Sequence, residues 1–236
     1  MIKGIINKIL PFSSVDGPGN RTGVFMQGCN FNCAYCHNPE TIEIGHSKVT
    51  LSMTVEEVIN EIIKTKSFIS GVTVSGGECT LQHEFLTALF KEIKKMDLST
   101  FIDTNGSLPF YKYPELVQVM DMAMVDVKAF DSREHIRLTS KDNDIVLKNV
   151  RYLAEINKLY EVRTVIVPGI LDNRNTVDMT SKLLASLNPQ IRYKLIKYRG
   201  LGVRSELIKS YTPSEKMMKE LMDIAKVNGC RNVVLV

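Results

Sequence analysis

Apolar runs of strand length alternate with helical stretches along this chain, and this alternation limits the possible folds more than any other feature. Six runs fit the length and composition of buried strands, at residues 22–27, 71–75, 100–103, 123–127, 162–167 and 192–196. Two shorter candidates lie at residues 5–10 and 233–236. Strands that alternate with helices predict a parallel sheet covered by helices.

Helical periodicity separates these strands. One apolar face contains Val55, Val58, Ile59, Ile62 and Ile63, and a second contains Phe85, Leu86, Leu89, Phe90 and Ile93. Thr54 and Glu57 form a capping box before the first of these helices. We expect the last helix to begin at Thr212, with Pro213 in its first turn and Glu215 three residues on.

The chain is long enough for one large core, since it has 236 residues, 44% of them hydrophobic and 24% charged. We predict a single domain over residues 1–236 with an α/β fold, a partial (β/α)6 TIM-like barrel. An open doubly wound sheet is the alternative. Both folds gather ligands at the carboxyl ends of the strands, so functional motifs are expected just after strands.

The charge pattern excludes some classes of partner. The net charge of +4 is spread along the chain, which is not the footprint of a nucleic-acid-binding protein. The first residues lack the apolar core of a signal peptide, and no apolar stretch reaches the length of a membrane span. We expect a soluble, cytoplasmic protein without membrane contact, and nothing in the sequence requires an oligomer, so we expect a monomer.

Three cysteines follow the first predicted strand, Cys29, Cys33 and Cys36, in C-x3-C-x2-C spacing. Three close thiolates can hold three irons of a 4Fe-4S cluster, which leaves the fourth iron open to a substrate or cofactor. An open iron favours a catalytic role over pure electron transfer. Only Cys79 and Cys230 remain, too few for a second cluster, so one cluster is expected and these two cysteines are expected to be structural.

Other interpretations of the triplet remain open at this point. Structural zinc prefers four ligands, and His37 is the nearest candidate for a fourth, in an unusually tight arrangement. The cysteines also fit buried apolar positions, or a disulfide and one free thiol, although the odd count of five and the expected reducing compartment disfavour a disulfide framework.

Polar and glycine motifs follow the next strands, as the fold predicts. Gly76, Gly77 and Glu78 come after one strand, and Asp103 and Thr104 end the next before an Asn-Gly pair. Glycines allow a backbone to approach a ligand closely. Each motif also fits a simple turn.

Charged residues end the following strands. Asp126 and Lys128 flank Val127, so both are expected on one face of the strand and directed into the barrel mouth, with an outward salt bridge as the alternative. Arg163 lies inside a buried strand and needs an anionic partner, for which Asp126 and Glu78 are candidates within the chain.

The set of motifs resembles the glycyl radical enzyme activases of the radical S-adenosylmethionine (SAM) superfamily, whose best-known member is the pyruvate formate-lyase activating enzyme. The resemblance rests on the segments at residues 16–21, 27–29, 33–39, 75–78, 103–106, 126–128 and 167–169 and covers nearly the whole chain. Residues 9–19 and 77–82 are most similar to the YjjW type. This chain lacks the ferredoxin-like, cysteine-rich insert that many such activases carry after the triplet.

The resemblance implies a cofactor site. Cys29, Cys33 and Cys36 would hold the cluster, and the amino and carboxylate groups of SAM would chelate the open iron. The backbone of Tyr35, Cys36 and His37 would lie against the adenine of SAM, and Gly76, Gly77 and Glu78 would lie near its amino group. Lys128 and Arg163 would bind its carboxylate, and Arg199 its ribose. Asp103, Asp126 and Val127 would lie beside them.

The resemblance also implies a monovalent cation, Na+ or K+, bound next to SAM by Asp103, Thr104, Asp126 and the backbone of Met124. Asp16 and Arg21 would help to seat the substrate loop. The substrate would be a backbone glycine of an anaerobic glycyl radical enzyme, and the electron donor a reduced flavodoxin or ferredoxin. Because the radical does the chemistry, no protein general base is expected.

Two other functions remain possible from the sequence. A small-molecule radical SAM enzyme, such as a deazapurine carboxylate synthase, would act on a free heterocycle without a protein partner. A non-catalytic iron–sulfur or zinc protein would form no 5′-deoxyadenosine from SAM, but it would not need the motifs at residues 76–78 and 126–128.

Overall fold

The computed structural model describes residues 2–43 and 50–236. The chain forms two compact units. The first comprises Met1–Asn30, Glu40–Thr104 and Phe110–Met124, and the second comprises Phe31–Pro39, Asn105–Pro109 and Val125–Val236. The cysteine loop therefore begins in the first unit, and most of it belongs to the second. Strand β6 (Met122–Asp126) begins in the first unit and ends in the second.

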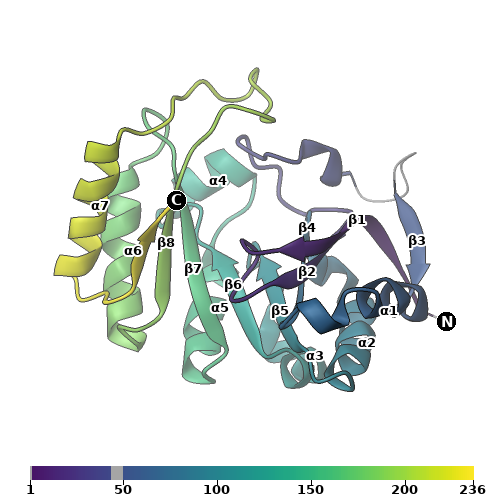
Figure 1. The fold of residues 1–236 in the computed structure, drawn as a ribbon. Helices are drawn as coiled ribbons and strands as arrows, with labels where there is room; N and C mark the ends of the chain where they lie inside the picture. Colours follow the sequence, from purple (N-terminus) through teal and green to yellow (C-terminus); the bar gives the residue numbers. More distant parts are fainter. Residues whose placement is uncertain (1, 44–49) are drawn as a thin grey trace. The chain divides into compact units, whose positions relative to one another are not determined.

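Five strands of the first unit follow one another in the order β3-β1-β2-β4-β5 (Figure 1). Their bounds are β1 Lys3–Ser13, β2 Arg21–Met26, β3 Leu51–Thr54, β4 Gly71–Gly76 and β5 Ser99–Thr104. The pairs β2–β4 and β4–β5 are parallel, as predicted, whereas β1 is antiparallel to both β2 and β3. The sequence did not reveal β3, because this edge strand has only four residues, none of them buried, and so short a segment gives little signal.

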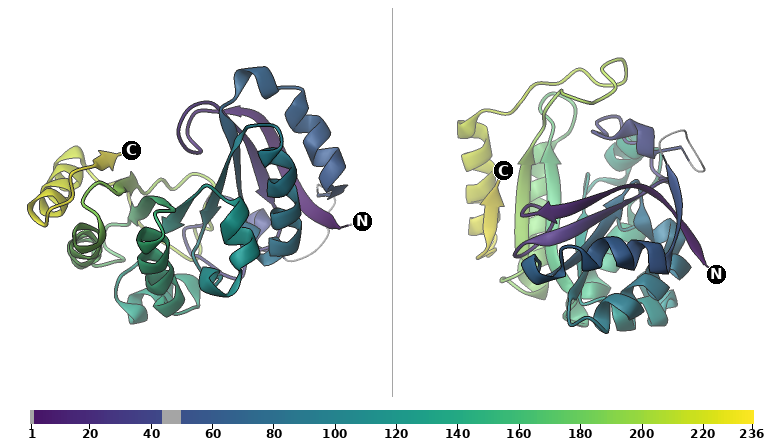
Figure 2. Two further views of the ribbon diagram at one scale, coloured as in Figure 1. Left: turned by 90° about the horizontal axis from the view of Figure 1, so that it is seen from below. Right: turned by 45° about the vertical axis from the view of Figure 1, so that its right-hand side comes forward.

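The helices of the first unit pack along one another in the order α1, α2, α3 (Figure 2). Their bounds are α1 Val55–Ile63, α2 His83–Lys94 and α3 Pro114–Val119. The capping box of Thr54 and Glu57 is present at the start of α1. All five predicted apolar positions of α2 are buried, but in α1 only Val58 and Ile62 are buried and Ile63 is exposed.

The second unit has three parallel strands in the order β7-β8-β9. They are β7 Leu159–Ile166, β8 Arg192–Lys197 and β9 Val233–Leu235. Its helices are α4 Ser132–Thr139, α5 Asp144–Glu155, α6 Asn173–Leu187 and α7 Glu215–Val227. Figure 1 shows α6 and α7 side by side next to β8 and β9. Parallel strands joined through helices in both units confirm the predicted α/β class.

The predicted start of the last helix is wrong by two residues. The N-cap of α7 is Ser214, not Thr212, and its hydroxyl accepts a hydrogen bond of 3.2 Å from the backbone N–H of Met217. Pro213 consequently lies before the helix. Both threonine and serine can cap a helix. Ser214 is the cap because its hydroxyl accepts from the backbone N–H three residues later, at Met217.

No helix in the described part of the chain is both long and apolar enough to cross a membrane.

Candidate active site

The turn after β4 presses against the segment that leads into Cys29. Gly76 has a φ of +122°, and a Cβ there would lie 2.2 Å from the carbonyl oxygen of Met26. A Cβ on Gly77 would lie 2.3 Å from the carbonyl oxygen of Gly28. Only glycine fits such approaches, since both obstacles are backbone. The N–H of Gly77 donates to the carbonyl oxygen of Met26 at 3.0 Å, so this N–H is already paired within the protein.

Gln27 fixes the two ends of the cysteine loop, a role that sequence analysis did not assign. Its side-chain amide donates to the carbonyl oxygens of Glu40 at 2.9 Å and Glu43 at 3.0 Å. The backbone N–H of Cys29 donates to Ile42 at 3.1 Å. The Gln27 side chain is buried, and Gln82 donates to its carbonyl oxygen at 3.0 Å. The Gln-Gly-Cys sequence could have indicated this role, because it places a glutamine directly before the cysteine loop. A buried glutamine side chain is normally hydrogen-bonded.

Glu78 and Thr104 meet at the carboxyl ends of β4 and β5, as predicted for functional motifs of a parallel sheet. One oxygen of the buried Glu78 carboxylate accepts from the Thr104 hydroxyl at 2.8 Å and from the Thr80 hydroxyl at 2.6 Å. Ser75 donates to Asp103 at 3.2 Å. Cys79 is buried beside them, and burial, with the nearby charges of Glu78 and Asp103, raises the pKa of its thiol. Cys79 is therefore a neutral, structural thiol.

The cysteine loop of the second unit is held by backbone hydrogen bonds to the end of α4. Asn32 and Ala34 donate to the carbonyl oxygens of Thr139 and Leu138, both at 2.9 Å. Cys33 is buried, and the N–H of Cys36 donates to the Cys33 carbonyl at 3.1 Å. The loop geometry thus comes from the protein itself.

Tyr35 anchors the same loop in an apolar cluster. Its ring packs with the buried side chains of Leu138, Val167, Leu171, Tyr198 and Ile208. Its hydroxyl is buried and has no hydrogen-bond partner in the described structure. Such an orphaned polar group is unusual in a folded protein and often marks a site of ligand binding.

Lys128 brings a positive charge to this loop. Its ammonium lies 2.9 Å from Asp126 and 5.7 Å from the centre of the Tyr35 ring, and its side chain is only 11% exposed. Burial lowers the pKa of Lys128, but the attraction of Asp126 and of the Tyr35 and Cys33 side chains outweighs burial and raises this pKa well above its usual value. Asp126 and Lys128 therefore share one side of the strand end, as predicted, with a permanently charged ammonium.

Two residues of the second unit that were predicted to contact the cofactor have partners within the protein. Val127 is fully buried, its N–H donates to the carbonyl of Arg163 at 2.9 Å, and its carbonyl accepts from the Thr164 hydroxyl at 2.9 Å. The contact of Val127 with a cofactor stays a prediction. Arg163 has an anionic partner within the unit in Glu161, at 2.6 Å.

Glu161 was missed by sequence analysis. Its carboxylate is 1% exposed and also lies 2.9 Å from both Lys194 and Arg192 on the neighbouring strand. Side chains two residues apart on β7 share a face, which explains why Glu161 reaches Arg163.

His37 and Arg199 lie next to each other, and their predicted contacts with the cofactor stay predictions. The His37 Nε2 atom lies 3.0 Å from the carbonyl oxygen of Arg199. The backbone of Gly202 also approaches, because a Cβ on Gly202 would lie 3.0 Å from the His37 carbonyl oxygen. The segment after β8 thus covers one side of the His37 backbone, which was expected to face adenine.

The side chain of Arg21 is fully buried. Its guanidinium donates to Thr73 at 2.7 Å and to the side chain of Ser99 at 2.9 Å, and it lies 4.2 Å from the centre of the Phe101 ring. It also donates to the Pro18 carbonyl at 3.4 Å. Arg21 therefore supports the loop before β2 from beneath, and its part in seating a substrate stays a prediction.

Asp16, in contrast, is half-exposed. Its carboxylate accepts from Ser13 at 2.5 Å, and its carbonyl accepts from the Thr73 hydroxyl at 2.5 Å. The loop is fixed at Asp16, and its contact with a substrate stays a prediction.

The predicted ligand sets are divided between the two units. Cys29 lies in the first unit and Cys33 and Cys36 in the second, while Asp103, Thr104 and Met124 lie in the first unit and Asp126 in the second. Among the residues that the structure describes, no three His, Cys, Asp or Glu side chains gather closely enough for one metal ion. The cluster and cation ligands therefore stay predictions.

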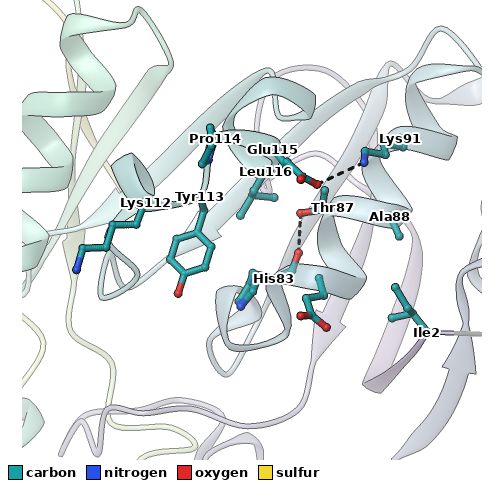
Figure 3. Close-up of a pocket in the computed structure, with 11 residues that line it drawn as sticks. Ile2, His83, Thr87, Ala88, Lys91, Lys112, Tyr113, Pro114, Glu115 and Leu116 are labelled. Carbon is teal, nitrogen blue, oxygen red and sulfur yellow. Dashed lines mark hydrogen bonds and ion pairs between the residues drawn. The ribbon is translucent and has the colours of Figure 1, made fainter.

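A cavity of about 620 Å³ in the first unit contains none of the predicted site residues (Figure 3). It lies beside α2 and α3, where the rings of His83 and Tyr113 are 4.5 Å apart and Lys91 lies 3.7 Å from Glu115. Its volume alone gives no reason to place chemistry there, since no buried titratable group faces it.

Comparison with known proteins identifies the family. The model of the Radical SAM superfamily matches residues 24–183. The pyruvate formate-lyase-activating enzyme of Staphylococcus epidermidis is 35% identical over 247 residues, which cover 97% of this chain and 98% of that protein. The enzyme of the same name from Streptococcus mutans is 36% identical over 210 residues, which cover 85% of this chain and 80% of that protein.

Solved structures agree on the fold. Streptococcus suis SuiB bound to S-adenosylmethionine superposes with a TM-score of 0.70 at 13% identity, covering 89% of this chain and 48% of that chain. QueE from Escherichia coli superposes with a TM-score of 0.63 at 14% identity, covering 100% of this chain and 95% of that chain. Identities this low show the fold alone, and they are consistent with the predicted partial barrel. The chain belongs to the radical SAM superfamily and, within it, to the enzymes that activate glycyl radical enzymes.

Proposed function

We propose that this enzyme uses a 4Fe-4S cluster to cleave S-adenosylmethionine reductively and removes a hydrogen atom from a backbone glycine of a partner glycyl radical enzyme. The observation that carries this proposal is the 35% identity, over nearly the full length of both chains, to an enzyme named for activating pyruvate formate-lyase. An identity spread over both units supports the same reaction type rather than a shared fold alone.

The residues present fit the cluster. Cys29, Cys33 and Cys36 are not in disulfides, and thiolates are the usual ligands of iron–sulfur clusters. A cluster with three thiolate ligands is anionic, and the buried cation of Lys128 lies beside the loop that carries two of them. The orphaned hydroxyl of Tyr35 is a second feature that suits a bound group at this loop.

When bound, the cluster supplies an electron to the sulfonium of SAM, and the resulting 5′-deoxyadenosyl radical takes the hydrogen atom. The protein binds and orients the reactants. Lys128, oriented by Asp126, holds the SAM carboxylate, and carbonyl oxygens at Gly76 and Gly77 accept from its amino group, with Glu78 fixing this turn. The backbone of residues 35–37 receives the adenine, and Arg199 the ribose.

Other parts of the proposal concern the surroundings of SAM. A monovalent cation is bound by Asp103, Thr104, Asp126 and the carbonyl of Met124. Arg163 contributes a second positive charge, although Glu161 already neutralises part of it. Asp16 contacts the glycine-bearing loop. A reduced flavodoxin or ferredoxin delivers the electron, and the enzyme acts as a single radical SAM domain and a monomer.

Electron paramagnetic resonance tests the function. The anaerobically reconstituted, reduced protein is mixed with SAM and the glycyl radical enzyme encoded nearest to it in its genome. We expect a glycine-centred doublet that disappears in Cys29→Ala and persists in Cys230→Ala, since Cys230 is buried beside Ser181 and outside the proposed site. Formation of 5′-deoxyadenosine without a doublet would retain radical SAM chemistry but reject this partner. The absence of both products, with a cluster present, would reject the proposed function.

A further inference from the structure

The segment that follows β8, residues 198–211, lies across the cysteine loop of the second unit, and we refer to it as the strap. Figure 1 shows it in yellow-green between β8 and α7. Tyr198 and Ile208 anchor the strap in the apolar cluster around Tyr35. The hydroxyl of Ser210 adds a hydrogen bond of 2.7 Å to the carbonyl of Pro168. The strap is therefore held at both ends, although Leu201 between them is 90% exposed.

Between these anchors, the strap touches the cysteine loop at three points. The Arg199 carbonyl and the Gly202 backbone both meet His37. The third contact is a hydrogen bond of 2.9 Å from Arg204 Nη2 to the carbonyl oxygen of Cys33. Cys33 and Arg204 are 171 residues apart in the sequence, so only the folded chain creates this contact.

The guanidinium of Arg204 is incompletely paired within the described structure. Its Nε is buried and has no hydrogen-bond partner. A buried N–H without an acceptor costs free energy, and proteins retain such groups mostly where another role requires them. The arrangement joins a permanent positive charge and an unused donor to the backbone of a proposed cluster ligand.

We propose that Arg204 is a positioning residue whose charge favours the reduced state of the cluster held by the cysteine loop. This inference rests on the proposed function, because it presumes that Cys33 is a cluster ligand. Reduction adds one negative charge to the cluster, and a fixed cation close to a ligand stabilises that charge more than the oxidised state. Hydrogen bonds and charges around the ligands are known determinants of cluster potential. Arg204 is fixed by its bond to Cys33, so its effect requires no movement of the strap.

The test is a redox titration of the reconstituted holoenzyme without SAM, followed by electron paramagnetic resonance, in Arg204→Gln, Arg204→Met and Arg204→Lys. At the wild-type midpoint, we expect the ratio of reduced to oxidised cluster to fall about tenfold in the two neutral variants, which is a shift of about 59 mV for one electron. Arg204→Lys keeps the charge and should stay within about threefold of wild type. Lys209→Gln is the matched control, since it removes an equal charge from an exposed position on the strap and should cause no shift.

Iron content is measured for every variant. Wild-type midpoints in the neutral variants would overturn the proposal, as would an equal shift in Lys209→Gln. If one neutral variant loses the cluster, the midpoint potential of the other neutral variant tests the proposal. Loss from both, with Arg204→Lys intact, would also overturn it, because Arg204 would then be a requirement for assembly. These failures are distinct from failure of the proposed function, in which wild type itself would form no redox-active cluster or no product from SAM.

Discussion

Replacement of Arg21 should destabilise the fold rather than weaken substrate binding. The guanidinium donates to the Thr73 hydroxyl at 2.7 Å, to the Val72 carbonyl at 2.9 Å and to the Ser99 carbonyl at 3.0 Å, all in the interior of the first unit. Arg21→Met leaves these three acceptors without their donor. At roughly 1.5 kcal/mol for each buried group, the loss is about 4.5 kcal/mol. The variant no longer buries a charge, which returns part of this loss, so we expect about 3 kcal/mol of net destabilisation.

Arg21→Lys separates charge from geometry. Lysine keeps the charge but places its three donors on one atom, so it cannot reproduce the planar fork that reaches Thr73, Val72 and Ser99 together. The variant buries an incompletely paired cation, and we expect a loss of about 3 to 5 kcal/mol, at least as large as in Arg21→Met. A residue that recognised a substrate through its charge would show the reverse order.

Urea unfolding of the holoenzyme, followed by circular dichroism, measures these effects. With a denaturant slope of about 3 kcal/mol/M, a loss of 3 kcal/mol lowers the midpoint by about 1 M. Arg133→Met is the control, because Arg133 is exposed and methionine has a similar helix propensity; we expect a change below about 0.5 kcal/mol. Wild-type stability in Arg21→Met together with a tenfold higher KM for the partner enzyme would refute the buried-network interpretation.

Three further changes test other parts of the structure. Gly76→Ala should lower the free energy of unfolding, measured in urea, more than Gly169→Ala does. Both glycines have a positive φ, which costs an alanine about 1–3 kcal/mol, but only at Gly76 would the Cβ also meet backbone, at 2.2 Å. Equal losses of stability would contradict the clash. Lys128→Met should raise the Kd for SAM at least tenfold in a binding titration while iron content stays near wild type, and an unchanged Kd would exclude the carboxylate contact. Burial lowers the pKa of His135 against the opposing effect of its 2.7 Å contact with the Lys141 carbonyl. The unfolded chain therefore takes up this proton first, so stability is complete above about pH 6.5 and falls as the pH decreases. The dependence of unfolding free energy on pH below about pH 6.5 should be weaker in His135→Asn. An equal dependence in the variant would reject the role of His135.

Local sequence patterns predicted most of the fold because they report local geometry. Apolar runs of strand length located β2, β4, β5, β6, β7 and β8 to within three residues at each end, and the helical period located α2. The rule that ligands gather at the carboxyl ends of parallel strands also brought Glu78 and Thr104 together correctly. Edge strand β3 was not predicted, because it has only four residues and buries none of them, so its sequence gives little signal.

The chemistry of the proposed site was also readable from the sequence. Thiolates at C-x3-C-x2-C spacing limit the possible cofactors, and this limit depends only on residue type and distance along the chain. The partners of buried charges could not be predicted in this way. Arg21 meets Ser99 across 78 residues, Arg163 pairs with Glu161, which was not among its predicted partners, and Arg204 reaches Cys33 across 171 residues.

The sequence thus determined which thiols, carboxylates and cations this protein has, and which strands they follow along the chain. Only the tertiary structure decided which charged side chains are paired in the interior and which lie beside the cysteine loop. The physical reason is that a buried charge must find a partner wherever packing places one, and packing depends on contacts that no local periodicity records.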